Sequence, residues 1–120
     1  MKTIQNEINR LNFEDWIFVI FIVVAILNIY GDQLQKKYIN ENNPTYQIKA
    51  NKVYLVVIII TILIYIYFVK RNYNLFIHSE YSRKKTTGIK FLGSILLLIG
   101  SICLLYFQLN ENDFIGAPNI

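Results

Sequence analysis

Few side chains in this sequence have the chemistry for catalysis or metal binding. The chain has one histidine, His78, and one cysteine, Cys103. A lone histidine does not build a zinc site, and a lone cysteine cannot form an internal disulfide. The HExxH, GxSxG and phosphate-loop motifs are absent. We therefore expect no enzyme, with no catalytic, cofactor-binding or metal-binding residues and no cofactor.

Small residues form the most specific pattern. Gly93 and Ser94 recur seven positions later as Gly100 and Ser101. Seven residues are nearly two helical turns, so these four side chains lie along one stripe of a helix. Small stripes let membrane helices approach closely, and hydroxyls can bond across helices. We expect this stripe to pack against another helix of the same chain, and contact with a second chain is the alternative.

Basic residues gather in and beside the second connector. They are Lys70, Arg71, Arg83, Lys84, Lys85 and Lys90. Such residues keep a segment on the cytoplasmic side of a membrane, which is the role we expect here. Binding of anionic lipid, at about 1 kcal/mol per residue, is the alternative. Nucleic-acid binding is not expected, although the net charge is +4, because the cations flank apolar blocks.

Three continuous apolar blocks position these residues. We predict transmembrane spans at about 13–33, 52–70 and 89–109, followed by an irregular tail over 110–120. A helix rises about 1.5 Å per residue, so roughly 20 residues cross a hydrocarbon core of about 30 Å. The blocks do not alternate apolar and polar residues as barrel strands do. The predicted fold is therefore an all-α membrane protein with three transmembrane helices in a single domain.

Polar segments mark the expected helix ends. Asn12 is a candidate N-cap of the first helix, and Thr86 or Thr87 of the third. Asn43 is a candidate cap of the second helix, with Pro44 as its first residue. We expect the first two helices to extend beyond the membrane and to turn near 40–44, which makes an extramembrane helical hairpin.

The distribution of charge predicts orientation. Eight of the twelve Lys and Arg residues lie before the first span or in and beside the second connector, and four lie in and beside the first connector. Basic residues in short loops stay in the cytoplasm. We predict a multi-pass protein of the cell membrane with the N-terminus inside and the C-terminus outside. The first block is expected to be a retained helix, because no small-x-small cleavage site follows it.

The composition indicates classes of membrane protein and does not identify one function. No Asp, Glu, Lys, Arg or His lies at the centre of a span, where ion-coupled transporters carry one. We expect a small non-enzymatic membrane protein, an accessory or scaffold subunit or a self-associating bundle, with the lipid bilayer and a protein partner or further copies as its contacts. A small homo-oligomeric pore and a membrane immunity protein are the alternatives. The richness in Ile, Asn, Lys and Tyr suggests a bacterial source.

Overall fold

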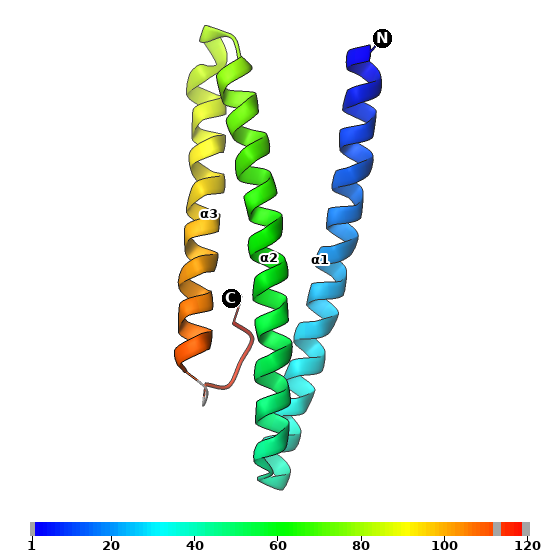
Figure 1. Ribbon diagram of the computed structural model, residues 1–120, viewed down its shortest axis with the longest axis vertical. Helices are drawn as coiled ribbons and strands as arrows, with labels where there is room; N and C mark the ends of the chain where they lie inside the picture. The colour runs from blue at the N-terminus through cyan, green and yellow to red at the C-terminus, as the bar shows by residue number, and fades with distance from the viewer. Residues whose placement is uncertain (1, 112–113, 119–120) are drawn as a thin grey trace.

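The computed structural model describes residues 2–111 and 114–118 and is helical over most of that length (Figure 1). Helix α1 spans Lys2–Glu41, α2 spans Pro44–His78 and α3 spans Lys84–Asn110, with a short 3₁₀ helix, η1, at Tyr81–Arg83. All three α-helices are long and apolar enough to cross a membrane. The prediction of an all-helical chain with three such helices is therefore confirmed.

Helix α1 begins earlier than the sequence indicated. Asn12 lies inside the helix rather than at its N-cap, so that prediction is wrong. The preceding segment has no Gly or Pro to stop a helix. Its Glu7 and Arg10 form an ion pair one turn apart, at 2.7 Å, which favours the same helix. The helix therefore continues about ten residues before the predicted span.

The ends of α2 follow the sequence more closely. Asn43 caps the helix by accepting a hydrogen bond from the backbone N–H of Thr45 at 3.0 Å, and Pro44 is the first helical residue, as predicted. Asn42 has a positive φ of 53° and completes the two-residue connection from α1. Asn tolerates this left-handed conformation better than most residues, which permits such a tight turn.

Helix α3 begins before the predicted cap. Thr86 and Thr87 lie within its first turn, where both hydroxyls donate to the carbonyl of Arg83 at 3.0 and 2.9 Å, so the predicted threonine cap is wrong. The buried Thr87 hydroxyl also lies 2.9 Å from that of Ser79. Lys84 donates to the last carbonyls of α2, Phe76 and Ile77, at 2.6 and 3.2 Å. These bonds tie the two helices together at their connection.

The three helices form one flat layer instead of a closed bundle. Helix α2 lies between its neighbours and packs against both, whereas α1 and α3 make no contact in the described parts of the chain (Figure 1). The molecule accordingly measures 59 × 26 × 15 Å. Helix α1 lies close to α2 near their connection and diverges from it toward the N-terminal end. One face of α2 is therefore left open between α1 and α3.

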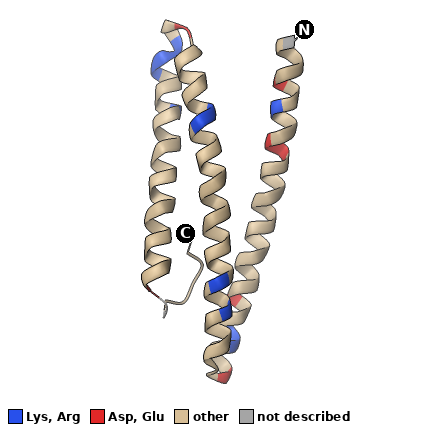
Figure 2. Cartoon of the chain, viewed as in Figure 1, with Lys and Arg blue, Asp and Glu red and all other residues tan. Residues whose placement is uncertain are grey.

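Packing along the layer follows a heptad. Six of the eight buried residues of α2 recur at alternating spacings of three and four, at Gln47, Ala50, Tyr54, Val57, Thr61 and Ile64. The buried residues of α3 are seven apart, at Thr87, Ser94, Ser101 and Gln108. A repeat of 3.5 residues keeps one seam facing its neighbour along long, slightly crossed helices. Figure 2 shows the charged residues gathered toward the ends of the layer, with an uncharged middle.

Candidate functional site

The four residues of the predicted stripe differ in burial, although all of them line the same side of α3. Ser94 and Ser101 are buried against the rest of the chain, and their hydroxyls donate to carbonyls of their own helix, at Phe91 and Leu97, at 2.7 and 2.9 Å. Gly93 and Gly100 are exposed. A Cβ built on either glycine would meet no atom within 4 Å. The serines therefore serve packing inside the chain, and the glycines leave a flat surface beside it.

Two neighbouring cavities lie along this surface, in the open space between α1 and α3. They measure about 540 and 370 Å³. Both are lined by Phe21 of α1, Tyr65 of α2 and Leu97 of α3. Gly93 lines the larger cavity and Gly100 the smaller one. We call this continuous depression the α1–α3 groove.

The α3 wall of the groove has its own helical repeat. Gly93, Leu97, Gly100 and Leu104 line it at spacings of four, three and four, and Lys90, Ser94, Leu96 and Ser101 line it beside them. This is the spacing at which one helix presents knobs and holes to another, and here small and large residues alternate. At one end of the groove lies Asn72, which is 5% exposed. Its Oδ1 is buried and has no hydrogen-bond partner among the described residues.

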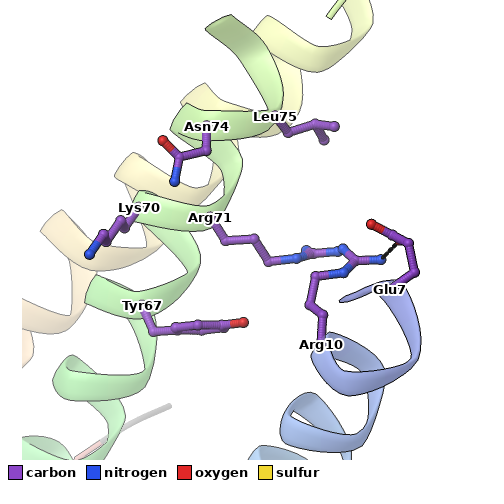
Figure 3. A pocket seen from close by; sticks show the side chains of 7 residues that line it. All are labelled: Glu7, Arg10, Tyr67, Lys70, Arg71, Asn74 and Leu75. Carbon is purple, nitrogen blue, oxygen red and sulfur yellow. Dashed lines mark hydrogen bonds and ion pairs between the residues drawn. The ribbon is translucent and has the colours of Figure 1, made fainter. Parts of the chain in front are cut away.

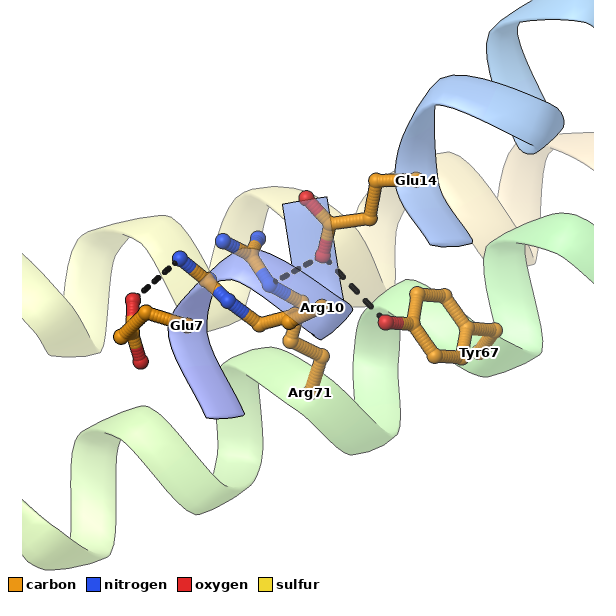
Figure 4. Close-up of polar contacts among 5 residues, drawn as sticks. All are labelled: Glu7, Arg10, Glu14, Tyr67 and Arg71. Atoms are coloured by element: carbon orange, nitrogen blue, oxygen red, sulfur yellow. Dashed lines mark hydrogen bonds and ion pairs between the residues drawn. The ribbon is translucent and has the colours of Figure 1, made fainter. Parts of the chain in front are cut away.

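A polar cluster joins α1 to α2 where the two helices diverge. Glu14 is 6% exposed, and its Oε2 lies 2.7 Å from Nε of Arg71 on α2 (Figure 4). This is an ion pair whose N–H is not aligned as a hydrogen bond. The Tyr67 hydroxyl donates to the same carboxylate oxygen at 3.3 Å. Arg71 therefore spans the gap that backbone packing leaves open.

A second cation from α1 lies beside this pair. Arg10 and Arg71 extend toward each other from opposite helices (Figure 3). Together with Glu7, Tyr67, Lys70, Asn74 and Leu75 they line a cavity of about 460 Å³. The Arg10 terminal nitrogen pairs with Glu7 at 2.7 Å, whereas its buried Nε has no hydrogen-bond partner. Lys70 makes no ion pair or hydrogen bond with any described residue.

The other predicted basic residues have different surroundings. The Lys84 ammonium bonds the end of α2 and lies 4.9 Å from the centre of the Phe76 ring. Arg83, Lys85 and Lys90 are exposed. The six residues therefore form no single site, and only Lys70 and Arg71 share a cavity.

A buried polar network lies at the opposite end of the α1–α2 pair. The Tyr54 hydroxyl, in a residue 1% exposed, bonds Asp32 and donates to Gln35 Oε1 at 3.1 Å. Gln35 also bonds the tail: its Nε2 donates to the Phe114 carbonyl at 3.1 Å, and its Oε1 accepts from the Gly116 amide at 2.9 Å. The described part of the irregular tail is thus held against α1 and α2.

The polar side chains within the spans bond to their own chain. Thr61 is 6% exposed and donates to the Val57 carbonyl at 2.8 Å. Ser94 and Ser101 are equally buried, and Asn28 is half-buried with interactions inside the chain. His78 lies at the exposed end of α2, with its Nδ1 2.9 Å from the Asn74 carbonyl. These side chains therefore have polar interactions within the chain.

Sequence reasoning missed the two polar clusters. Glu14 and Arg71 lie at matching distances from the midpoints of the first and second predicted spans, nine and ten residues respectively. In antiparallel helices such residues meet at one level, so the ion pair had a usable signal. The Tyr54, Asp32 and Gln35 network had none, because it requires the rotation of each helix about its axis.

Comparison with known proteins adds no relative. No family model matches the chain, and no curated protein or solved structure matches it.

Proposed function

We propose that this protein is a non-enzymatic accessory subunit of a membrane assembly, which holds one apolar transmembrane helix of another protein in its α1–α3 groove. The observation that carries the proposal is the α3 wall: exposed Gly93 and Gly100, with Leu97 and Leu104 between and beyond them. The residues of this wall are spaced as in helices that pack against one another, yet no helix of the described chain packs on it. Within the bilayer the hydrophobic effect does not favour association of helices, because lipid tails are as apolar as the side chains. Association therefore depends on van der Waals packing, which is closest where glycines let two helix backbones approach.

The shape of the groove favours a single helix over a symmetric pair of copies. A twofold interface brings one patch against itself, so the patch must be self-complementary. Two concave grooves facing each other would leave a void, whereas one convex helix fills a groove. The buried, unpartnered Oδ1 of Asn72 at one end adds a position for a hydrogen-bond donor of the partner. Such a bond contributes about 0.6 to 2 kcal/mol between membrane helices.

The proposed setting is the cell membrane, with the N-terminus in the cytoplasm and the tail outside. Its support is the excess of Lys and Arg at the N-terminal and α2–α3 end, eight residues against four. In this orientation the α1–α2 connection and the Tyr54 network lie at the outer side. The two helices extend there as a short extramembrane hairpin, and the tail is bound to its base through Gln35.

Photocrosslinking from defined positions tests the groove. A photoreactive residue replaces Leu97, which lines the groove, or Cys103, which is exposed on α3 and lines neither groove cavity. We expect the Leu97 probe in native membranes to crosslink one membrane protein of different sequence, and the Cys103 probe to give no such product. Crosslinks from Leu97 only to lipid, or only to further copies of this chain, would contradict the proposal.

A paired substitution provides the control. Gly93→Leu with Gly100→Leu places side chains in the groove, where nothing inside the chain lies within 4 Å. We expect the crosslink from Leu97 to disappear while the stability of the isolated chain stays unchanged. Ile102→Ala serves as the control, because Ile102 is 51% exposed on α3 and lines neither groove cavity. An unaffected crosslink in the double variant would remove the role of the glycines.

A further inference from the structure

We propose that the cavity between Arg10, Lys70 and Arg71 binds a phosphate group, and that its source in the membrane is the headgroup of an anionic lipid. The proposal does not depend on the helix groove or on its occupant. It rests on the charges that line the cavity, on hydrogen-bond donors without partners, and on the level of the cavity along the helices.

The lining carries a net positive charge. Arg10, Lys70 and Arg71 line the cavity with one carboxylate, Glu7, and Glu14 pairs with Arg71 from beside it. Three cations against two carboxylates leave one positive charge, and a phosphodiester carries one negative charge. Two guanidinium groups extending toward each other repel, because like charges raise each other's energy at low dielectric. An anion between them removes that repulsion.

The donors are available. A guanidinium has five N–H donors in a planar fork that fits phosphate oxygens. Only one nitrogen of Arg10 is used, in the pair with Glu7, and its buried Nε has no partner. The Nε of Arg71 lies near Glu14 without hydrogen-bond alignment. Lys70 has no partner among the described residues. The terminal nitrogens of Arg71 and the second terminal nitrogen of Arg10 also make no bond to a described residue, so a phosphate oxygen in the cavity can accept hydrogen bonds from them.

The cavity lies at the level of lipid headgroups. Arg71 is ten residues beyond Thr61, the midpoint of the second predicted span, which is about 15 Å along the axis. Half of a hydrocarbon core of about 30 Å is the same distance. Arg10 is thirteen residues before the midpoint of the first span, at about 20 Å. The two guanidiniums therefore reach the layer in which lipid phosphates lie, through the gap where α1 diverges from α2 (Figures 1 and 3).

Binding is measured by native mass spectrometry of the full chain in a neutral detergent. The protein is titrated separately with phosphatidylglycerol, phosphatidylcholine and inorganic phosphate. We expect one phosphatidylglycerol to bind at least about tenfold more tightly than phosphatidylcholine, whose choline is repelled by the same cations. Inorganic phosphate binding more tightly than phosphatidylglycerol would overturn the lipid source and retain the phosphate site. No preference for either anion over phosphatidylcholine would overturn the whole proposal.

Variants locate the binding. Arg10→Gln and Lys70→Gln are each expected to weaken phosphatidylglycerol binding about tenfold, because each removes a charged donor. Lys85→Gln is the matched control: it makes the same charge change on an exposed residue outside the cavity, and we expect less than a twofold effect. An equal loss in Lys85→Gln would mean diffuse surface attraction and would overturn the proposal.

A variant that keeps the charge separates binding from folding. Leu75→Trp fills the cavity, and Leu75 is already 36% exposed, so the fold has room for the larger side chain. We expect this variant to unfold like the parent chain and to lose the preference for phosphatidylglycerol. Retained tenfold preference in Leu75→Trp would place the lipid elsewhere and contradict the site.

Discussion

The Glu14–Arg71 ion pair joins α1 to α2 where their backbones diverge, and replacing it should lower the free energy of unfolding measurably. Its side chains are 8% and 19% exposed, and the closest atoms are 2.7 Å apart. With charge centres about 4 Å apart, the attraction is about 1 kcal/mol in water and about 4 kcal/mol at an effective dielectric near 20. Desolvation offsets part of this gain. We therefore expect a coupling free energy of about 2–3 kcal/mol.

A double-mutant cycle with Glu14→Gln, Arg71→Gln and the double variant isolates this coupling. The chain has one tryptophan, Trp16 on α1, and one cysteine, the exposed Cys103 on α3. Energy transfer from Trp16 to a dye on Cys103 therefore follows the separation of the helices during unfolding by SDS in mixed micelles. The free energies of unfolding lost in the two single variants should add up to more than the loss in the double variant, and the difference is the coupling. A coupling below about 0.5 kcal/mol would refute the ion pair as a structural link.

Two further substitutions test the packing near the α1–α2 connection with the same unfolding assay and with amide exchange. In Gly31→Ala, the new Cβ would lie 2.6 Å from the Tyr54 ring, which is 1% exposed, so we expect a loss of about 1–3 kcal/mol. Gly93→Ala is its control and should be neutral or slightly stabilising, because nothing lies within 4 Å. Gln35→Leu removes both bonds to the tail, and the Gly116 amide should then exchange with solvent much faster. Unchanged exchange at Gly116 would mean that the tail is held by other contacts.

The sequence predicted the number and kind of elements because the physical cause is local. Continuous apolar runs without alternation, such as the one around Ile58, require helices when they are long enough to cross a membrane. The start of α2 was predictable for the same reason, since Asn43 and Pro44 act on their own backbone. The start of α1 was not predictable from Asn12, because a residue that can cap a helix does not end it, and no Gly or Pro precedes it to stop the helix.

The arrangement of the helices was not predictable, because it depends on which faces meet. The four small residues 93, 94, 100 and 101 are predicted to line one stripe, within which adjacent residues differ by about 100° in direction. The structure places Ser94 and Ser101 inward and leaves Gly93 and Gly100 outward. All four residues line the two neighbouring cavities, and the difference in burial between the serines and the glycines appears only in three dimensions.

The charged residues show the same limit. The sequence grouped cations that are neighbours in the chain, whereas the cavity joins Arg10 of α1 with Arg71 of α2. Chain proximity placed Lys84 and Lys85 together, although one bonds the end of α2 and the other is exposed. Antiparallel pairing of the first two predicted spans would have predicted this contact, since it brings Arg10 and Arg71 to similar positions along the helix axes.

The mass of the tagged protein, purified gently from its native membrane, tests the proposed accessory role most directly. We predict a complex of one copy of this chain with one copy of a different membrane protein, lost when Gly93 and Gly100 are both replaced by leucine. A discrete homo-oligomer, or a monomer carrying only lipid in both the parent chain and the double variant, would contradict the proposal.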